Sequence, residues 1–171
     1  MKAIDTFYQE ALEILNSQMY CVLSTASLQG EPWISPVFFA FDEKINLFWV
    51  SEECSRHSTL VKQNPRLSCV VFNSSATPGE GNAVYFSGGV KIVAEDQLQK
   101  PLKLLKARAT KSGPFSKYEI SDMIAESPWR LYQLTPVNAW ILKDKAEVRG
   151  WEVDRKQELD LSLVSQAMQK K

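Results

Sequence analysis

The chain has 171 residues, 44% hydrophobic and 23% charged, and its 20 basic side chains balance 20 acidic ones. This length and apolar fraction predict one domain with a hydrophobic core. Zero net charge argues against a nucleic-acid binder, which needs a basic surplus to neutralise phosphates. No stretch approaches the ~18 apolar residues that span a bilayer, and the N-terminal segment lacks the apolar region of a signal peptide. We therefore expect a cytoplasmic protein with neither a nucleic-acid nor a membrane partner.

The cysteines and the single histidine exclude several kinds of site. Three widely spaced cysteines, Cys21, Cys54 and Cys69, fit neither a disulfide framework nor a cysteine zinc site. His57 alone cannot build a zinc hydrolase, and no GxSxG sequence accompanies it as in a serine hydrolase. The phosphate-binding patterns GxGxxG and GxxxxGK[ST] are also absent. We predict no metal site, and if the protein is an enzyme, we expect a cofactor to carry its chemistry.

The N-terminal half reads as one helix followed by short antiparallel strands. Residues 4–17 have apolar side chains at helical spacing, which predicts an amphipathic helix. Tyr20–Thr25, Pro32–Phe41 and Ile45–Val50 are β-branched and aromatic runs separated by turn residues, which predicts a three-stranded meander. Their connections are too short for helical crossovers, so a parallel sheet is excluded here.

The second of these strands is apolar on both faces, with Trp33 and Val37 on one and Ile34 and Phe38 on the other. Such a strand needs cover on both sides, which favours a barrel whose outer wall is buried by a partner chain or a ligand. The edge strand of an ordinary sandwich is the alternative. Pro36 has no N–H to donate, so we expect the ladder to be interrupted there.

The rest of the chain predicts more strands and short helices. Residues 55–63 form a short helix that Ser55 caps and Asn64-Pro65 ends. The Gly88-Gly89 pair predicts a bulge or a close approach of another backbone. The other predicted elements are strands at Leu67–Asn73, Ala83–Val93, Trp129–Leu134 and Val137–Leu142, helices at 96–109 and 116–126 (opened by a Ser116-x-x-Glu119 capping box), and a charged tail from about residue 143 that ends in a weak helix at 159–170.

The densest polar cluster follows the third strand, where Ser51, Ser55, Arg56 and His57 gather at a predicted helix start. Free helix-start amides, the positive end of the helix dipole and a guanidinium together suit an anion such as phosphate. The alternative is that Ser55 only caps the helix, while Arg56 and His57 are solvated.

The order of these parts resembles the pyridoxamine 5'-phosphate oxidase-like proteins of the FMN-binding split-barrel superfamily. The resemblance covers residues 4–93 and, more loosely, Trp129–Trp140. Its motifs are Leu23-Ser24-Thr25, Gly30-Glu31-Pro32, Ser35-Pro36-Val37, Phe48-Trp49-Val50-Ser51, Ser55-Arg56-His57, Asn64-Pro65 and Gly88.

This resemblance implies a homodimer with flavin mononucleotide (FMN) in clefts between the two barrels. Carried over by residue, it implies that Ser51, Ser55, Arg56 and His57 hold the phosphate, Ser35, Pro36 and Val37 run beside the isoalloxazine, Val50 and Ser51 offer backbone groups to the ring, and Trp140 flanks the flavin. Ser35 and Ala40 stand where pyridoxamine phosphate oxidases carry basic residues, Ala83 replaces a glutamine, and no RxH follows Trp140. These departures argue against activity on vitamin B6.

We therefore expect a single domain over residues 1–171, mainly β with flanking helices, folded as a homodimeric antiparallel split β-barrel of six or seven strands. The expected function is FMN-dependent transfer of hydride or electrons between a reduced nicotinamide or small organic substrate and an acceptor, the substrate being unknown. Two alternatives stay open: a split barrel that binds haem or a deazaflavin, and a cofactor-free dimeric binding or regulatory module.

Overall fold

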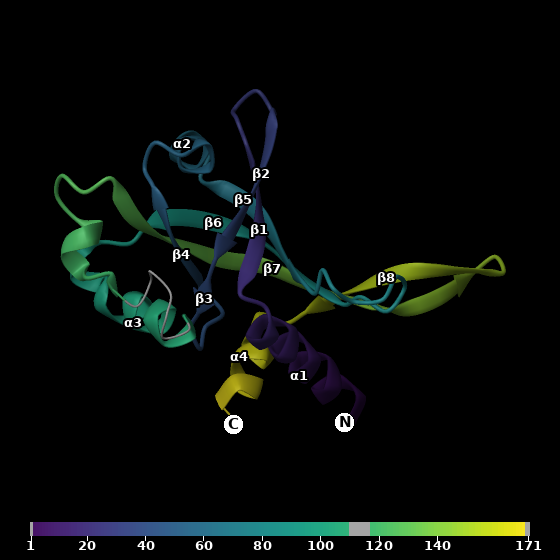
Figure 1. Ribbon diagram of the computed structural model, residues 1–171. Helices are drawn as coiled ribbons and strands as arrows, with labels where there is room; N and C mark the ends of the chain where they lie inside the picture. The colour runs from purple at the N-terminus through teal and green to yellow at the C-terminus, as the bar shows by residue number, and fades with distance from the viewer. Residues whose placement is uncertain (1, 110–116, 170–171) are drawn as a thin grey trace.

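The computed structural model describes residues 2–109 and 117–169. Its elements are α1 (Lys2–Ser17), β1 (Tyr20–Ala26), β2 (Pro32–Phe38), β3 (Ala40–Phe41), β4 (Leu47–Glu52), α2 (Arg56–Gln63), β5 (Arg66–Phe72), β6 (Ala83–Ile92), η1 (Glu95–Gln97), α3 (Gln99–Arg108), η3 (Ile120–Met123), β7 (Trp129–Val148), β8 (Trp151–Leu159) and α4 (Leu161–Gln169) (Figure 1).

One eight-stranded sheet dominates the fold, in the order β2-β1-β5-β6-β7-β4-β3, with β8 paired to β7. Every pairing is antiparallel. The segment predicted as one strand, Pro32–Phe41, divides at Phe39: β2 pairs with β1 and β3 pairs with β4, so one segment serves both ends of the sheet. The sheet is thus an antiparallel half-barrel, as the resemblance implied. The predicted antiparallel meander is confirmed in its pairings, because the first part of this segment pairs with β1 and its last two residues pair with β4, although the segment is two strands and not one.

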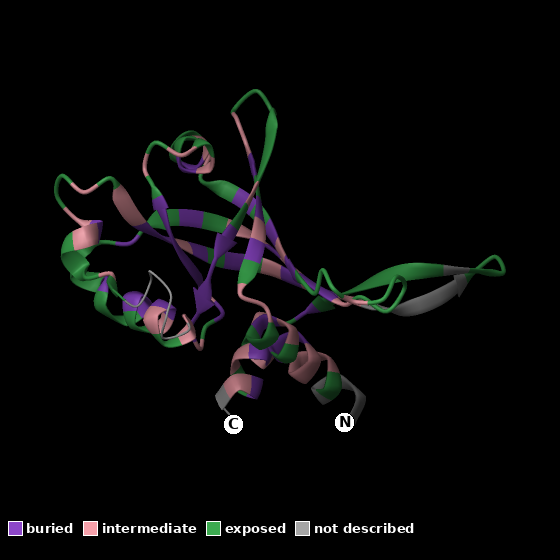
Figure 2. Ribbon diagram, viewed as in Figure 1, coloured by how far each residue is buried: buried purple, intermediate pink, exposed green. Residues whose placement is uncertain are grey.

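Two hydrophobic cores lie on opposite faces of this sheet. The larger core fills the inside of the half-barrel and is closed at one end by α1 and α4, which pack against each other. The smaller core lies between α3 and the outer side of β3, β4 and the start of β7. Figure 2 shows the buried residues concentrated in these strands, with exposed residues along the β1–β2 and β7–β8 hairpins.

The last part of the predicted second strand, residues 37–41, is covered on both faces within the chain itself. Val37 and Phe39 belong to the inner core, whereas Phe38 and Ala40 pack in the core under α3. The expectation that a partner or ligand covers the outer set is therefore wrong for these residues, because the helix of their own chain reaches them. Ile34, nearer the start of β2, keeps 67% of its surface exposed.

The predicted interruption at Pro36 is also wrong. Pairing of β1 with β2 runs without a shift through the Val22–Pro36 pair. Because β2 is the last strand of the sheet, one of its edges needs no partner, and such an edge tolerates a residue that lacks an N–H.

The prediction at Gly88 is confirmed, because the register of β6 against β7 shifts between Ser87 and Gly88. A β-carbon on Gly88 would overlap the carbonyl of Thr135 and lie 2.9 Å from Cα of Pro136. Glycine is required where two backbones approach this closely.

Some elements of the C-terminal half differ from the predicted ones. The helix predicted at 96–109 divides into η1 and α3. Ser116 lies outside the described residues, and the element that follows is the 3-10 helix η3, opened by a capping box between Glu119 and Asp122. The two predicted final strands are one continuous β7, which runs through Thr135-Pro136.

The charged segment after residue 142 is the projecting part of a hairpin. It comprises the end of β7 and all of β8, and in Figure 1 it extends away from the barrel. The predicted terminal helix corresponds to α4.

Candidate functional site

A cluster of hydroxyls and one imidazole joins the end of β4 to the start of α2. Nε2 of His57 lies 2.8 Å from Oγ of Ser51 and 3.3 Å from Oγ of Ser55. The Ser55 hydroxyl donates to Oγ of Ser58 at 2.8 Å. Ser51 and Ser58 are buried. The end of β4 thus meets the N-cap residue of α2 and two side chains of its first turn, and we call Ser51, Ser55, His57 and Ser58 the serine–histidine cluster.

The first turn of α2 has no side-chain cap. Ser55 occupies the N-cap position with extended backbone, as predicted, yet its side chain makes no capping bond and donates to Ser58 instead. The amides of the first helical turn have no partner within a helix, so those of Arg56 and His57 stay available to an incoming acceptor.

His57 is neutral in this setting. Burial of the imidazole lowers the pKa of His57 below its ordinary value of about 6.5. At pH 7 the ring therefore donates or accepts hydrogen bonds without adding positive charge. The permanent positive charge at the start of α2 comes from Arg56.

The guanidinium of Arg56 lies over an aromatic ring and is free of acids. Its Cζ is 4.5 Å from the centroid of the Trp33 ring. Among the residues that the structure describes, no carboxylate forms a salt bridge with Arg56. The nearby Glu53 pairs instead with Lys62 at 2.8 Å and with Arg130 at 3.0 Å. The donors of Arg56 are thus open to an external anion.

Ser35 is linked to Arg56 through the same tryptophan, because Nε1 of Trp33 donates to Oγ of Ser35 at 3.0 Å. Pro36, the next residue, is exposed at the sheet edge. The side chains of Val37 and Val50 are buried in the inner and outer cores respectively, so only their backbone groups are left for a ligand.

The two strands that carry these residues each have an open edge. β2 pairs only with β1, and β3 pairs only with Leu47 and Phe48 of β4. From Trp49 to Glu52, the edge of β4 opposite β7 has no strand partner within the described part of the chain. β2 contacts β4 across the split in the barrel, and α2 contacts β2, where Arg56 lies over the Trp33 ring.

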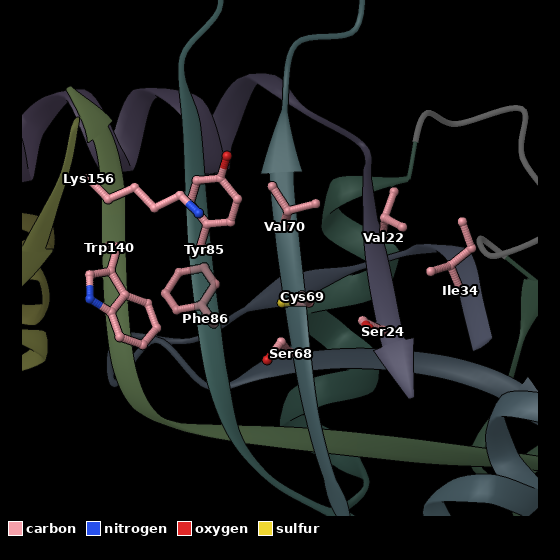
Figure 3. Close-up of a pocket in the computed structure, with 10 residues that line it drawn as sticks. All are labelled: Val22, Ser24, Ile34, Ser68, Cys69, Val70, Tyr85, Phe86, Trp140 and Lys156. Atoms are coloured by element: carbon pink, nitrogen blue, oxygen red, sulfur yellow. The ribbon is translucent and has the colours of Figure 1, made fainter. Parts of the chain in front are cut away.

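Trp140 lies elsewhere. It lines a hollow of about 590 Å³ on the outer face of the sheet, beside Tyr85, with Val22, Ile34 and Val70 further along (Figure 3). Nζ of Lys156 reaches over the Tyr85 ring, 4.3 Å from its centroid. No residue of the serine–histidine cluster lines this hollow.

The described residues offer neither a metal-binding cluster nor a membrane-spanning helix. They contain no group of three or more His, Cys, Asp or Glu side chains that could hold a metal ion. None of their helices is long and apolar enough to cross a membrane.

The antiparallel half-barrel, with helices over its outer face and its end, is that of a split-barrel protein. A family model described as pyridoxamine 5'-phosphate oxidase matches residues 7–140, so the chain belongs to the pyridoxamine 5'-phosphate oxidase family. This confirms the resemblance seen in the motifs. A search of curated proteins found no match.

Solved structures share this fold at low sequence identity. A pyridoxamine 5'-phosphate oxidase-related, FMN-binding protein from Nostoc punctiforme is 14% identical, with a TM-score of 0.57 and coverage of 91% of this chain and 95% of that one. A NimC/NimA family protein from Clostridium acetobutylicum is 18% identical (TM-score 0.60, coverage 92% and 96%). HutZ, a haem storage protein from Vibrio cholerae, is 18% identical (TM-score 0.62, coverage 75% and 88%). The shared fold thus accommodates more than one cofactor.

Proposed function

We propose that this protein binds FMN and acts as a flavin-dependent oxidoreductase. The observation that carries the proposal is Arg56, a guanidinium without an acid partner at the uncapped start of α2. A guanidinium fork, free helix-start amides and the positive end of a helix dipole are a donor set that suits a phosphate. The FMN-binding relative from Nostoc punctiforme, which has the same fold, adds support.

The residues present fit the two ends of FMN. Arg56, the first-turn amides of α2 and the hydroxyls of Ser51 and Ser55 would hold the phosphate, with neutral His57 as a further hydrogen-bond donor. The facing edges of β2 at Ser35–Val37 and of β4 at Val50–Ser51 would border the isoalloxazine with backbone groups. Backbone N–H groups at an unpaired strand edge need acceptors, which the polar rim of a flavin provides.

When bound, FMN would supply hydride or electron transfer, as flavins do. The protein would bind the phosphate, orient the ring between two strand edges and direct backbone N–H groups toward the polar rim of the ring. The serine–histidine cluster holds little acid at pH 7, because burial lowers the pKa of His57, the cluster's imidazole, below its ordinary value. Hydride transfer, which requires no protein acid, is the chemistry this favours.

Oxidation of vitamin B6 is not part of the proposal. Of the two positions where pyridoxamine phosphate oxidases carry basic residues, one is Ser35 and the other is Ala40, which is buried under α3. A side chain at that second position faces the core and cannot reach a substrate phosphate.

The haem alternative rests on the same fold, but this site supports it less. His57 is the only histidine of the chain, and its Nε2 is already within hydrogen-bond distance of Ser51 and Ser55. An axial ligand to iron would have to give up these contacts. A deazaflavin that carries a phosphate would use the same donors as FMN. The absorption spectrum of the bound cofactor distinguishes the two.

We also propose that the protein works as a homodimer through the outer face of the sheet. Ile34 is 67% exposed and lines the hollow that contains Trp140, and Val137 is 72% exposed and lines a second hollow, which shares Ser24 and Ser68 with the first. Exposed apolar groups that adjoin a hollow are typical of an interaction surface. Because no residue of the serine–histidine cluster lines the hollow of Trp140, a flavin held by the cluster and flanked by tryptophan would need Trp140 of the partner subunit.

The decisive experiment is an FMN titration of the wild-type protein, Arg56→Ala and the matched control Lys62→Ala, which removes an exposed cation from the other end of α2. Loss of a charge-assisted contact should weaken FMN binding by about 30- to 1,000-fold in Arg56→Ala, whereas Lys62→Ala should bind like wild type. Riboflavin, which lacks the phosphate, should bind all three proteins equally weakly.

Three results would contradict the proposal. Equal FMN affinity in Arg56→Ala and wild type would place the phosphate elsewhere. A haem spectrum after reconstitution, without flavin binding, would favour the haem alternative. A protein that takes up neither would favour the cofactor-free binding or regulatory module.

A further inference from the structure

Trp33 connects the two ends of the proposed FMN site. The face of its indole lies under the guanidinium of Arg56, 4.5 Å from Cζ to the ring centroid, and its Nε1 donates to Oγ of Ser35 at 3.0 Å. Arg56 is proposed for the phosphate, and Ser35 lies on the strand proposed to run beside the ring. One side chain thus contacts both.

Burial does not account for this tryptophan. Trp33 is 40% exposed and belongs to neither of the two cores, in contrast to Trp49, which is 1% exposed in the inner core. A large aromatic side chain held at the surface by two polar contacts is more useful for orienting its neighbours than for packing.

Stacking suits an arginine that must receive a phosphate. An arginine stacked on an aromatic face keeps the N–H groups at its edge free, while its long side chain is held in place. No salt bridge of the described residues restrains Arg56, so the stack with Trp33 is the contact that orients its guanidinium. Ordering the side chain before the ligand arrives reduces the entropy lost on binding.

We propose that Trp33 is a positioning residue for FMN, whose ring face holds Arg56 for the phosphate and whose N–H orients Ser35 beside the isoalloxazine. This inference rests on the proposed FMN site. The two roles use different parts of the indole, so substitutions separate them. Phenylalanine keeps an aromatic face without the N–H, whereas leucine removes both.

The test measures the affinity for FMN and for riboflavin in wild type, Trp33→Phe, Trp33→Leu, Arg56→Ala and the double variant Trp33→Leu/Arg56→Ala. Loss of the stack in Trp33→Leu should weaken FMN binding by about 3- to 30-fold and change riboflavin binding little. Trp33→Phe should keep most of the FMN affinity. In the Arg56→Ala background, Trp33→Leu should have almost no further effect, because its partner is gone.

The bound chromophore reports the second role. Trp33→Phe and Ser35→Ala should produce the same displacement of the flavin absorption band, because each breaks the one hydrogen bond between these residues. Circular dichroism and thermal unfolding confirm that each variant is folded.

Equal losses of FMN and riboflavin affinity in Trp33→Leu would overturn the inference, as would effects of Trp33→Leu and Arg56→Ala that simply multiply in the double variant. Either result would make Trp33 a packing residue, but it would not contradict the proposal that the wild-type protein binds FMN. A wild-type protein that binds no FMN would instead overturn the proposed function and this inference with it.

Discussion

Nε2 of His57 and Oγ of Ser51 are 2.8 Å apart, and this contact joins the end of β4 to the first turn of α2. Ser51 is buried at the end of β4, and burial holds the imidazole in its neutral form. Burial of the imidazole therefore makes the stability of the protein depend on pH.

Acidification should destabilise the protein through His57. Its pKa in the folded state is below the ordinary value of about 6.5, so the unfolded chain takes up the proton first. The stabilising contribution is complete above pH 6.5 and is lost as the pH falls through the folded-state pKa. Urea unfolding at several pH values should show wild type losing stability relative to His57→Gln below pH 6.5. The slope of this difference cannot exceed about 1.4 kcal/mol per pH unit and should be smaller, because the ring is only half-buried. Parallel curves for the two proteins would contradict the assignment.

Gly88 and Gly89 should respond differently to alanine. The added methyl at Gly88 would collide with the backbone of Thr135 and Pro136, whereas the atom nearest to a β-carbon on Gly89 is 4.0 Å away. We expect Gly88→Ala to lower the free energy of unfolding by about 2–3 kcal/mol, and Gly89→Ala by less than about 1 kcal/mol. Chemical denaturation of both variants measures this contrast. Equal stabilities would mean that β6 and β7 do not approach as closely as the structure has them.

The proposed dimer should break when a charge is placed on the outer face. Ile34 and Leu28 are 67% and 70% exposed, but only Ile34 lines the hollow, and Leu28 lies between β1 and β2. Ile34→Glu should raise the dissociation constant at least about tenfold, because a buried carboxylate is costly, and Leu28→Glu should leave it unchanged. Light scattering over a concentration series measures the mass. A wild-type protein that stays monomeric at micromolar concentration would rule out this interface.

Only one of the three cysteines should react quickly in the folded protein. Cys54 is exposed, whereas Cys21 and Cys69 are buried. A hydrogen bond with Cys21 and burial both raise the pKa of the Cys69 thiol, which disfavours the reactive thiolate. A colorimetric thiol reagent should therefore titrate one group in native protein and three after denaturation. The fast phase should disappear in Cys54→Ser, and a remaining fast phase would show that the inner core opens.

Local patterns of the sequence were sufficient for most of the individual elements. Helical periodicity predicted α1, and the asparagine before Pro65 marked the end of α2, because each depends on side chains a few residues apart. The bulge at Gly88 was readable for the same reason. The projecting hairpin beyond residue 142 was missed because most of its described β8 residues are exposed, which leaves no alternation of apolar and polar positions.

By itself, then, the sequence determined most of the β segments before residue 143, the short helix at Arg56–Gln63 and the polar residues at its start, since propensity, capping and turn chemistry are local. Only the tertiary structure decided which helices and side chains pack against one another. It placed α3 over Phe38 and Ala40, stacked Arg56 on Trp33, and set Trp140 on an outer face away from the serine–histidine cluster. These contacts join residues far apart in the chain, and they depend on how the sheet curves and where it splits at Phe39. That curvature cannot be predicted from the local pattern of residues along the chain.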